Sequence, residues 1–284
     1  MIAYVNNTFV DEADATIGIG DLAIQRGYGV FDFFRTINFT PLFPDDYLDR
    51  FFRSAALLRI APLHTKSEII DIIAEMSGRN GIADAAFRMI LTGGYSSDGY
   101  SPVSPNFMII QQPIQMADDN DFERGLKIIL HEYMRDLPEA KSINYLIGIY
   151  LKERILQQNA DDVLYYYDGA VLEFPRSNVF IVTKDKTVVT PGKNVLAGIT
   201  RMKVLEIAKQ QYKTEQRMVT VEDLKNAAEV FLTSTTKRIL PVVNIDDIIV
   251  SDGVPGEVTR SLYNDFLTME KQIVSQKHTL PVAE

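Results

Sequence analysis

The stretch of chain from residue 163 to residue 200 predicts two β-hairpins followed by a helix. The Asp-Gly pair at 168–169 is a dipeptide that favours a tight hairpin turn, and the polar residues 184–186 close a second hairpin. Gly198–Thr200 then opens the apolar-periodic run TRMKVLEIAKQ, which has helical spacing. The free amides and positive dipole at such a helix start can bind a phosphate, and Thr200 adds a hydroxyl.

Glu173 is a carboxylate that the strand pattern places in or beside the interior. It lies between the apolar pairs 171–172 and 174–175, and a buried charge needs a partner. Lys141 lies earlier in the chain, before a helical run rich in Ile, Leu and Tyr. A lysine, a phosphate cradle and a buried carboxylate together indicate pyridoxal phosphate, bound to the lysine as an imine with its ring nitrogen paired to the acid. The alternative for Glu173 is an ordinary surface ion pair with Arg176.

Composition restricts the class of partner. The net charge of −9 argues against nucleic acid and anionic membranes, and favours a small-molecule substrate. The chain has no cysteine, and its three histidines lack ligand spacing, so we expect no metal site. The first residues have neither the basic start nor the apolar core of a signal peptide, and no run approaches the length of a membrane span. We therefore expect a cytoplasmic protein.

A chain of 284 residues is long enough for two domains. The polar run at 115–121 is the clearest break in the pattern, which predicts a small α/β domain at 1–114, a linker at 115–121 and a larger α+β domain at 122–284. A cofactor cleft between two such domains is the expectation. Helices are predicted at 45–60, 66–80, 142–158, 200–212 and 257–273, with strands at 29–39, 86–93, 106–114, 127–133, 163–173, 178–190, 229–236 and 239–250.

Four sequence blocks that follow one another in order resemble those of the class IV aminotransferases, the fold-type IV pyridoxal phosphate enzymes. They are Lys141, EFPRSNVF at 173–180, LAGITR at 196–201 and VFLTSTT at 230–236. The resemblance extends back to YLDRFFRSAALL around Arg50 and so covers nearly the whole chain. Each block alone is weak, but their joint order is specific. The resemblance implies an α+β fold with a small open domain and a larger domain built on a mixed-sheet pseudo-barrel.

The same resemblance assigns roles to individual residues. Lys141 would form the imine and carry the substrate α-proton, and Glu173 would contact the pyridine nitrogen. Arg50 would bind the cofactor phosphate, although an isolated arginine at this place could also bridge Asp46 on the same helix. The implied set of cofactor-binding residues is Arg50, Lys141, Glu173, Asn178, Leu196, Gly198, Ile199, Thr200, Ser234 and Thr235.

Departures from the family pattern concern the substrate. D-amino acid aminotransferases of this family bind the substrate carboxylate with a tyrosine at the place of Phe31 and with an arginine and a histidine in a later loop, where this chain has Asp98 and Tyr100. A carboxylate facing Asp98 would be repelled, so another cation must bind it. Arg26 and Arg88 are the candidates, although Arg88 could equally point to solvent. The predicted substrate-binding residues are Arg26, Phe31, Arg88, Tyr100 and Thr236.

The resemblance implies a pyridoxal phosphate transaminase that moves an amino group between a D-amino acid and a 2-oxo acid. A branched-chain L-amino acid aminotransferase and an aminodeoxychorismate lyase are alternatives, because these relatives share the imine chemistry and differ in the substrate pocket. A pyridoxal phosphate-binding protein without catalysis is a further alternative from another class. Family members are homodimers whose subunits complete each other's sites, so Arg26 would enter the neighbouring pocket.

Overall fold

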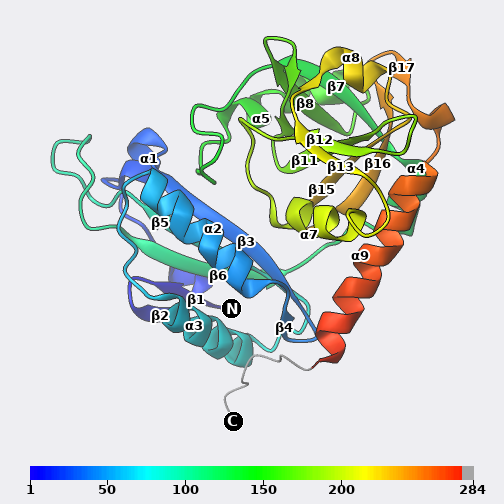
Figure 1. The fold of residues 1–284 in the computed structure, drawn as a ribbon. Coiled ribbons are helices and arrows are strands. Elements are labelled where there is room, and N and C mark those ends of the chain that lie inside the picture. The colour runs from blue at the N-terminus through cyan, green and yellow to red at the C-terminus, as the bar shows by residue number, and fades with distance from the viewer. Residues whose placement is uncertain (277–284) are drawn as a thin grey trace. The chain divides into compact units, whose positions relative to one another are not determined.

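The computed structural model describes residues 1–276, and the chain divides into two compact units (Figure 1). The first unit contains Met1–Ile114, Ala140–Asn144 and the end of the last helix from Glu270. The second contains Gln115–Glu139 and Tyr145–Met269. The segment around Lys141, which the sequence placed in the larger domain, therefore belongs to the first unit.

Within the described residues, the first unit is built on a six-stranded sheet in the order β2-β1-β6-β5-β3-β4, with antiparallel pairing throughout. The long central pair is β3 and β5, in which Phe33 lies opposite Arg88. The elements are β1 (Ile2–Val5), β2 (Thr8–Asp11), the 3-10 turn η1 (Glu12–Asp14), α1 (Leu22–Arg26), β3 (Gly29–Ile37), β4 (Thr40–Pro41), α2 (Pro44–Leu57), α3 (Lys66–Asn80), β5 (Ala85–Thr92) and β6 (Phe107–Pro113).

Two amphipathic helices cover one face of this sheet. Helix α2 begins with a proline and acidic residues in its first turn, and α3 begins with a capping box at Thr65; both are local signals for a helix start. Aromatic side chains join α2 to the sheet, since Phe34 packs on Tyr47 and Phe107 packs on Phe51. Figure 1 shows α2 alongside β3. Because strand residues alternate between faces, Phe31 and Phe33 lie on the opposite face.

Within the described residues, the second unit is built on an 11-stranded mixed sheet whose main path runs β13-β12-β11-β15-β16-β7-β8-β9-β14, with β10 on β11 and β17 on β16. Its elements are α4 (Asp119–Arg124), β7 (Leu126–Glu132), α5 (Leu146–Tyr150), α6 (Lys152–Gln157), β8 (Asp162–Tyr167), β9 (Ala170–Val171), β10 (Glu173–Phe174), β11 (Ser177–Val182), β12 (Val188–Pro191), α7 (Ile199–Ala208), β13 (Thr214–Arg217), β14 (Val219–Thr220), α8 (Val221–Lys225), β15 (Glu229–Ser234), β16 (Arg238–Ile245), β17 (Ile248–Ile249), η2 (Ser251–Gly253) and α9 (Glu257–Ser275).

Both predicted hairpins are confirmed. Asp168 and Gly169 have φ of 48° and 72°, as a type I′ turn requires, and they join β8 to β9. Residues 184–186 join β11 to β12, with Val182 opposite Val188.

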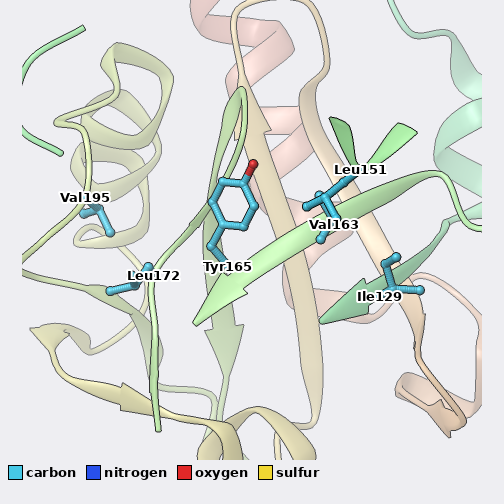
Figure 2. Packing of buried hydrophobic residues seen from close by; sticks show 6 residues of the cluster. All are labelled: Ile129, Leu151, Val163, Tyr165, Leu172 and Val195. Atoms are coloured by element: carbon cyan, nitrogen blue, oxygen red, sulfur yellow. The ribbon is translucent and has the colours of Figure 1, made fainter. Parts of the chain in front are cut away.

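An apolar cluster includes Val163 and Tyr165 of the first hairpin, and Figure 2 shows the Tyr165 ring among the other members. Leu172 and Val195 belong to it, so the residues that follow them, Glu173 and Leu196, are anchored by the core. The cluster consists of Ile129, Leu151, Val163, Tyr165, Leu172 and Val195.

Two segments differ from the sequence prediction. The helix expected at 142–158 begins only at Leu146 and consists of α5 and α6, because the residues before it pair with β3. The expected linker at 115–121 ends in a helix, since Asp118 caps α4 and accepts a hydrogen bond from the Asp121 amide. Pairing with β3 decided the conformation of the first segment, and the cap at Asp118 decided that of the second.

Within residues 1–276, no helix is long and apolar enough to cross a membrane. The same residues contain no group of three or more His, Cys, Asp or Glu side chains arranged to hold a metal ion.

Candidate active site

Lys141 lies in a short segment that adds to the edge of β3. The Phe31 amide donates to the Lys141 carbonyl at 2.9 Å, and the Ile143 amide donates to the Gly29 carbonyl at 3.1 Å. On its other side, the Lys141 amide donates to Oγ of the fully buried Ser54 on α2 at 3.1 Å. The backbone of Lys141 is therefore held between a strand and a helix. Its Nζ lies 4.5 Å from the centre of the Phe31 ring, a cation–π contact.

Arg88 lies on the same face of the sheet as Phe31. Its guanidinium carbon is 5.6 Å from the centre of the Phe31 ring and 5.5 Å from that of Phe33. The side chain is half-buried, and none of the carboxylates in the described residues forms an ion pair with it. Lys141 and Arg88 thus place two cationic groups over one aromatic ring. The Arg88 side chain therefore lies against the two rings and is not directed into bulk solvent.

Arg50 is buried and forms a forked ion pair. Its Nε donates to Asp32 Oδ2 at 2.9 Å and its Nη2 to Asp32 Oδ1 at 2.6 Å, and the two side chains are 4% and 0% exposed. Asp32 belongs to β3 and lies one residue from Phe31, on the helix-covered face. The pair fixes the guanidinium of Arg50 in two directions, which orients the residue that the family resemblance assigns to the phosphate.

Glu173 is buried, as predicted, and a cation beside it is Arg135. The sequence had named Arg176 only for the alternative of a surface ion pair. Arg135 Nε donates to Glu173 Oε1 at 2.8 Å, and Arg135 Nη2 lies 2.7 Å from the same oxygen. The second oxygen, Oε2, accepts the Leu196 amide at 2.9 Å. The carboxylate is therefore stabilised in its ionised form by a cation and a backbone donor.

Glu173 belongs to a row of polar residues across three strands. Glu173 lies opposite Asn178, and Asn178 lies opposite Thr233, in β10, β11 and β15. Asn178 Nδ2 donates to the Leu196 carbonyl at 2.9 Å, which ties the row to the loop before α7. The Thr233 hydroxyl is buried, and none of the described residues hydrogen-bonds to it. A buried hydroxyl without a protein partner is suited to a polar ligand.

Helix α7 begins at this row without a side-chain cap. Its N-cap is Gly198, which has an extended conformation and no capping side chain, so the first helical amides point outward. A Cβ on Gly198 would lie 1.9 Å from Asn178 Oδ1, so only glycine fits here. Ile199 and Thr200 in the first turn are buried. This set of donors fits a phosphate.

The hydroxyl residues at the end of β15 continue the row. Ser234 Oγ accepts the Lys237 amide at 3.2 Å, and the Thr236 carbonyl accepts the Ala117 amide at 3.1 Å. Thr235 lies between them in the turn after β15. The predicted residues from Glu173 to Thr236 all belong to the second unit, and hydrogen bonds join Glu173 and Asn178 to Leu196.

Arg26 and the loop at 95–101 also belong to the first unit. Arg26 is exposed at the end of α1, and among the described residues its hydrogen bond is to the Gln25 carbonyl at 2.9 Å. Asp98 is exposed, but its carboxylate is turned into its own loop and accepts both the hydroxyl and the amide of Ser101 and the Tyr100 amide. The Ser101 hydroxyl is the main cause that lowers the pKa of Asp98. Asp98 therefore shapes the loop, and Tyr100 is 80% exposed.

Three residues of these sites were not predicted from the sequence: Asp32, Ser54 and Arg135. Arg135 lies six residues before Lys141 in HEYMRDLPEAK, so its position in that block was the available signal. Asp32 and Ser54 gave no signal of their own, because their partners lie on other elements.

Comparisons with known proteins identify the family. Residues 29–245 match the model of the family Amino-transferase class IV, and the chain belongs to that family. It is 31% identical over 275 residues to a putative branched-chain-amino-acid aminotransferase of Methanocaldococcus jannaschii, covering 94% of this chain and 95% of the relative. It is 30% identical over 276 residues to the D-alanine aminotransferase of Listeria monocytogenes, with the same coverage of both chains.

Solved structures give the fold. The branched-chain amino acid aminotransferase of Escherichia coli superposes with a TM-score of 0.90 at 22% identity, covering 99% of both chains. A T.th. branched-chain amino acid aminotransferase complexed with N-(5'-phosphopyridoxyl)-L-glutamate superposes with a TM-score of 0.88 at 25% identity, covering 96% of this chain and 94% of that one. The protein has the α+β fold of the fold-type IV enzymes and is a pyridoxal phosphate-dependent class IV aminotransferase.

The donor set fits that cofactor. An open helix start next to Gly198 suits the phosphate, the ionised Glu173 suits a ring N–H, and Lys141 supplies a primary amine. When bound, pyridoxal phosphate supplies an electron-accepting ring for reactions at the substrate α-carbon.

Proposed function

We propose that this protein transfers amino groups between D-amino acids and 2-oxo acids, with Arg88 as the cation that binds the substrate carboxylate. One observation carries the proposal: Arg88 and Lys141 both lie over the Phe31 ring, and none of the described carboxylates neutralises Arg88. A carboxylate that enters a water-poor site must be paired, and a forked guanidinium is the side chain best suited to it.

The residues have separate roles in this proposal. Lys141 Nζ holds the cofactor and then takes the proton from the substrate α-carbon, while the bonds from Ser54 and Phe31 keep its backbone in place. Glu173 accepts the ring N–H, and the first amides of α7 with Thr200 bind the phosphate. Arg50 would bind the cofactor phosphate, with its guanidinium held by Asp32. Phe31 excludes water from the space between the two cations.

Support for the D-amino acid assignment comes from the D-alanine aminotransferases that match at 28–30% identity over 90% or more of this chain. The hydrogen bonds of Asp98 lie within its own loop, and its charge would repel a second carboxylate, so the proposal assigns the substrate carboxylate to Arg88 and not to this loop.

A branched-chain L-amino acid is the second candidate. Phe31, Phe33 and Ile90 form an apolar surface beside Arg88, which suits an aliphatic side chain, and the relative at 31% identity is named for that substrate.

A substrate panel separates these functions. Purified protein loaded with pyridoxal phosphate is mixed with D- and L-amino acids and with aminodeoxychorismate, and the change in cofactor absorbance is followed. We expect D-amino acids to react, and Lys141→Ala to abolish both turnover and the adduct that borohydride traps at that residue. Reaction with L-branched-chain substrates alone would replace the D-specific assignment, pyruvate release from aminodeoxychorismate would indicate a lyase, and no reaction at all would indicate a non-catalytic protein.

Arg88 is tested in the same assay. Arg88→Ala should lower kcat/KM for the amino acid by about tenfold or more, because a partly buried forked contact contributes about 1.5–3 kcal/mol. Arg79→Ala is the matched control, since Arg79 also lies over an aromatic ring, Phe9, but far from Lys141 in the sheet order. Normal kcat/KM in Arg88→Ala would remove this arginine from the proposal.

We further propose a homodimer in which Arg26 completes the site of the neighbouring subunit. Support comes from the exposure of Arg26 and from α5, whose Ile149 and Tyr150 are 65% and 77% exposed while Ile147 packs into the core. A short helix that is apolar on both faces is typical of one covered in an assembly. Lys141→Ala and Arg26→Ala, each inactive alone, should recover activity when their subunits exchange. Exchanged dimers without activity would exclude shared sites.

A further inference from the structure

Arg135 and Glu173 form a nearly buried ion pair in the second unit. The side chains are 15% and 7% exposed, and two guanidinium nitrogens approach the same carboxylate oxygen. The guanidinium also donates to the Pro138 carbonyl, within the segment that leads to Lys141. The guanidinium is therefore fixed on both sides, and it cannot leave the carboxylate without losing a backbone contact.

Apolar and aromatic groups surround this pair. Tyr133 and Tyr165 pack edge to face with ring centres 5.1 Å apart, and Tyr165 belongs to the core cluster of Figure 2. Burial is the main cause that raises the pKa of both tyrosines, so both stay neutral at ordinary pH. Few mobile charges therefore screen the pair, and a charge here acts strongly on its neighbours.

Other charged groups near the pair have partners of their own. Arg201 on α7 interacts with Glu173 through space, and its nitrogens donate to Thr190 Oγ1, the Pro191 carbonyl and Gln216 Oε1. Asp162 on β8 lies near Tyr165 and pairs with Lys237 at 2.9 Å. Asp136, beside Arg135, acts on Tyr133. Arg135 therefore differs from Arg201 in its direct hydrogen bond to the carboxylate.

We propose that Arg135 is a positioning residue that keeps the shared proton of the cofactor site on the ring nitrogen and off Glu173. This inference rests on the proposed contact between Glu173 and the cofactor ring. When a carboxylate and a pyridine nitrogen share one proton, the proton can reside on either. A guanidinium at 2.7 Å from the carboxylate stabilises its anionic form directly, and it repels a protonated ring only over a longer distance. The nearer attraction is larger, so the proton moves to the ring.

The expected effect is electrostatic more than structural. Without the guanidinium, a buried carboxylate is favoured in its neutral form, and the proton equilibrium should shift toward Glu173 by about one to two powers of ten. A protonated ring accepts electrons from the substrate α-carbon better than a neutral one, so the rate of proton removal by Lys141 should fall with it. A lysine at position 135 would keep the positive charge but would lose the two-nitrogen contact of the guanidinium.

The test measures the protonation of the ring directly. Protein is loaded with pyridoxal phosphate carrying ¹⁵N in the ring, and the ¹⁵N chemical shift is recorded across pH for the wild type, Arg135→Gln and Arg135→Lys. Arg154→Gln is the matched control, because Arg154 is a half-buried arginine of the same unit that contacts His131 and the Leu130 carbonyl. We expect Arg135→Gln to move the shift toward the unprotonated value. Arg135→Lys keeps the charge but loses the second N–H contact, so its titration midpoint should lie between those of Arg135→Gln and the wild type. Arg154→Gln should stay at the wild-type value.

The outcomes separate this inference from the proposed function. Circular dichroism and thermal melts establish that each variant is folded. If Arg135→Gln does not bind pyridoxal phosphate, the midpoint of the ¹⁵N titration of Arg135→Lys is compared with that of the wild type. A midpoint at or above the wild-type value overturns the inference. A wild-type ¹⁵N shift in folded Arg135→Gln also overturns it. Glu173→Gln should give an unprotonated ring. If Glu173→Gln instead retains the wild-type shift, the assignment of Glu173 in the proposed function fails, and the role of Arg135 fails with it.

Discussion

The two units each contain a buried arginine–carboxylate pair, and the pairs differ in which partner is expected to meet the cofactor. In the first unit, Arg50 is expected to meet the phosphate and Asp32 is its anchor, with side chains 4% and 0% exposed. In the second unit, Glu173 is expected to meet the ring and Arg135 is its anchor, with side chains 7% and 15% exposed. In the first unit a carboxylate therefore holds a functional cation in place, and in the second unit a cation holds a functional carboxylate in place.

The two pairs show why the sequence did not predict the anchors Asp32 and Arg135. A buried functional charge needs a counter-charge to compensate for its desolvation, and the counter-charge comes from whichever element packs nearby. For Arg50 that element is the neighbouring strand β3, and for Glu173 it is the coil after β7. The Asp32 pair is the more deeply buried, so its loss should cost more stability, whereas loss of Arg135 should mainly change the chemistry of the site.

The largest effect is expected for the anchor in the first unit. Asp32→Asn should lower the free energy of unfolding by about 3–5 kcal/mol, because it leaves the Arg50 charge buried without its partner. Denaturant unfolding followed by circular dichroism measures the change. Asp49→Asn is the control, since Asp49 forms an exposed pair with Lys66 and should cost less than about 1 kcal/mol. Equal losses in the two variants would show that burial does not distinguish these pairs.

A smaller effect on stability but a large one on ligand binding is expected at Gly198. Gly198→Ala places a Cβ against Asn178 Oδ1, so the start of α7 must shift, and affinity for pyridoxal phosphate should fall about tenfold or more. Absorbance titration of the apoprotein measures it. Gly20→Ala is the control, because the nearest atom to its added Cβ is 4.0 Å away. Unchanged affinity in Gly198→Ala would show that the start of α7 does not bind the phosphate.

The smallest effect is expected from His131 in the second unit. Burial is the main cause that lowers its pKa from the ordinary value of 6.5, and Arg154 contributes. As the pH falls below about 6.5, the unfolded chain takes up the proton first, so this contribution to stability is present above that pH and is lost as the pH falls through the lower folded pKa. His131→Gln should therefore reduce the decrease in Tm between pH 7 and pH 5.

His64→Gln serves as the control for that measurement, because His64 lies in the first unit. If the Tm of His131→Gln and of the wild type depend on pH in the same way, burial of His131 does not contribute to the acid sensitivity of the second unit. If His64→Gln alone removes the decrease, the acid-sensitive group belongs to the first unit.

Much of the second unit followed from local sequence. The Asp-Gly turn at 168–169 needs two positive φ values and obtains them, and the apolar neighbours of Glu173 placed it in the interior. Gly198 before an apolar-periodic run predicted a helix start, and α7 begins there. These features depend on a few adjacent residues, whose conformational preferences act over short distances.

The sequence by itself thus determined the two hairpin turns, the start of α7, the buried carboxylate and the family to which the chain belongs. Only the tertiary structure decided which cation meets Glu173, that Asp32 fixes Arg50, and that Arg88 lies with Lys141 over one ring. It also decided that Lys141 joins the first unit through pairing with β3. These contacts join residues far apart in the chain, and a pattern of neighbours carries no information about which distant side chain will fill a given space.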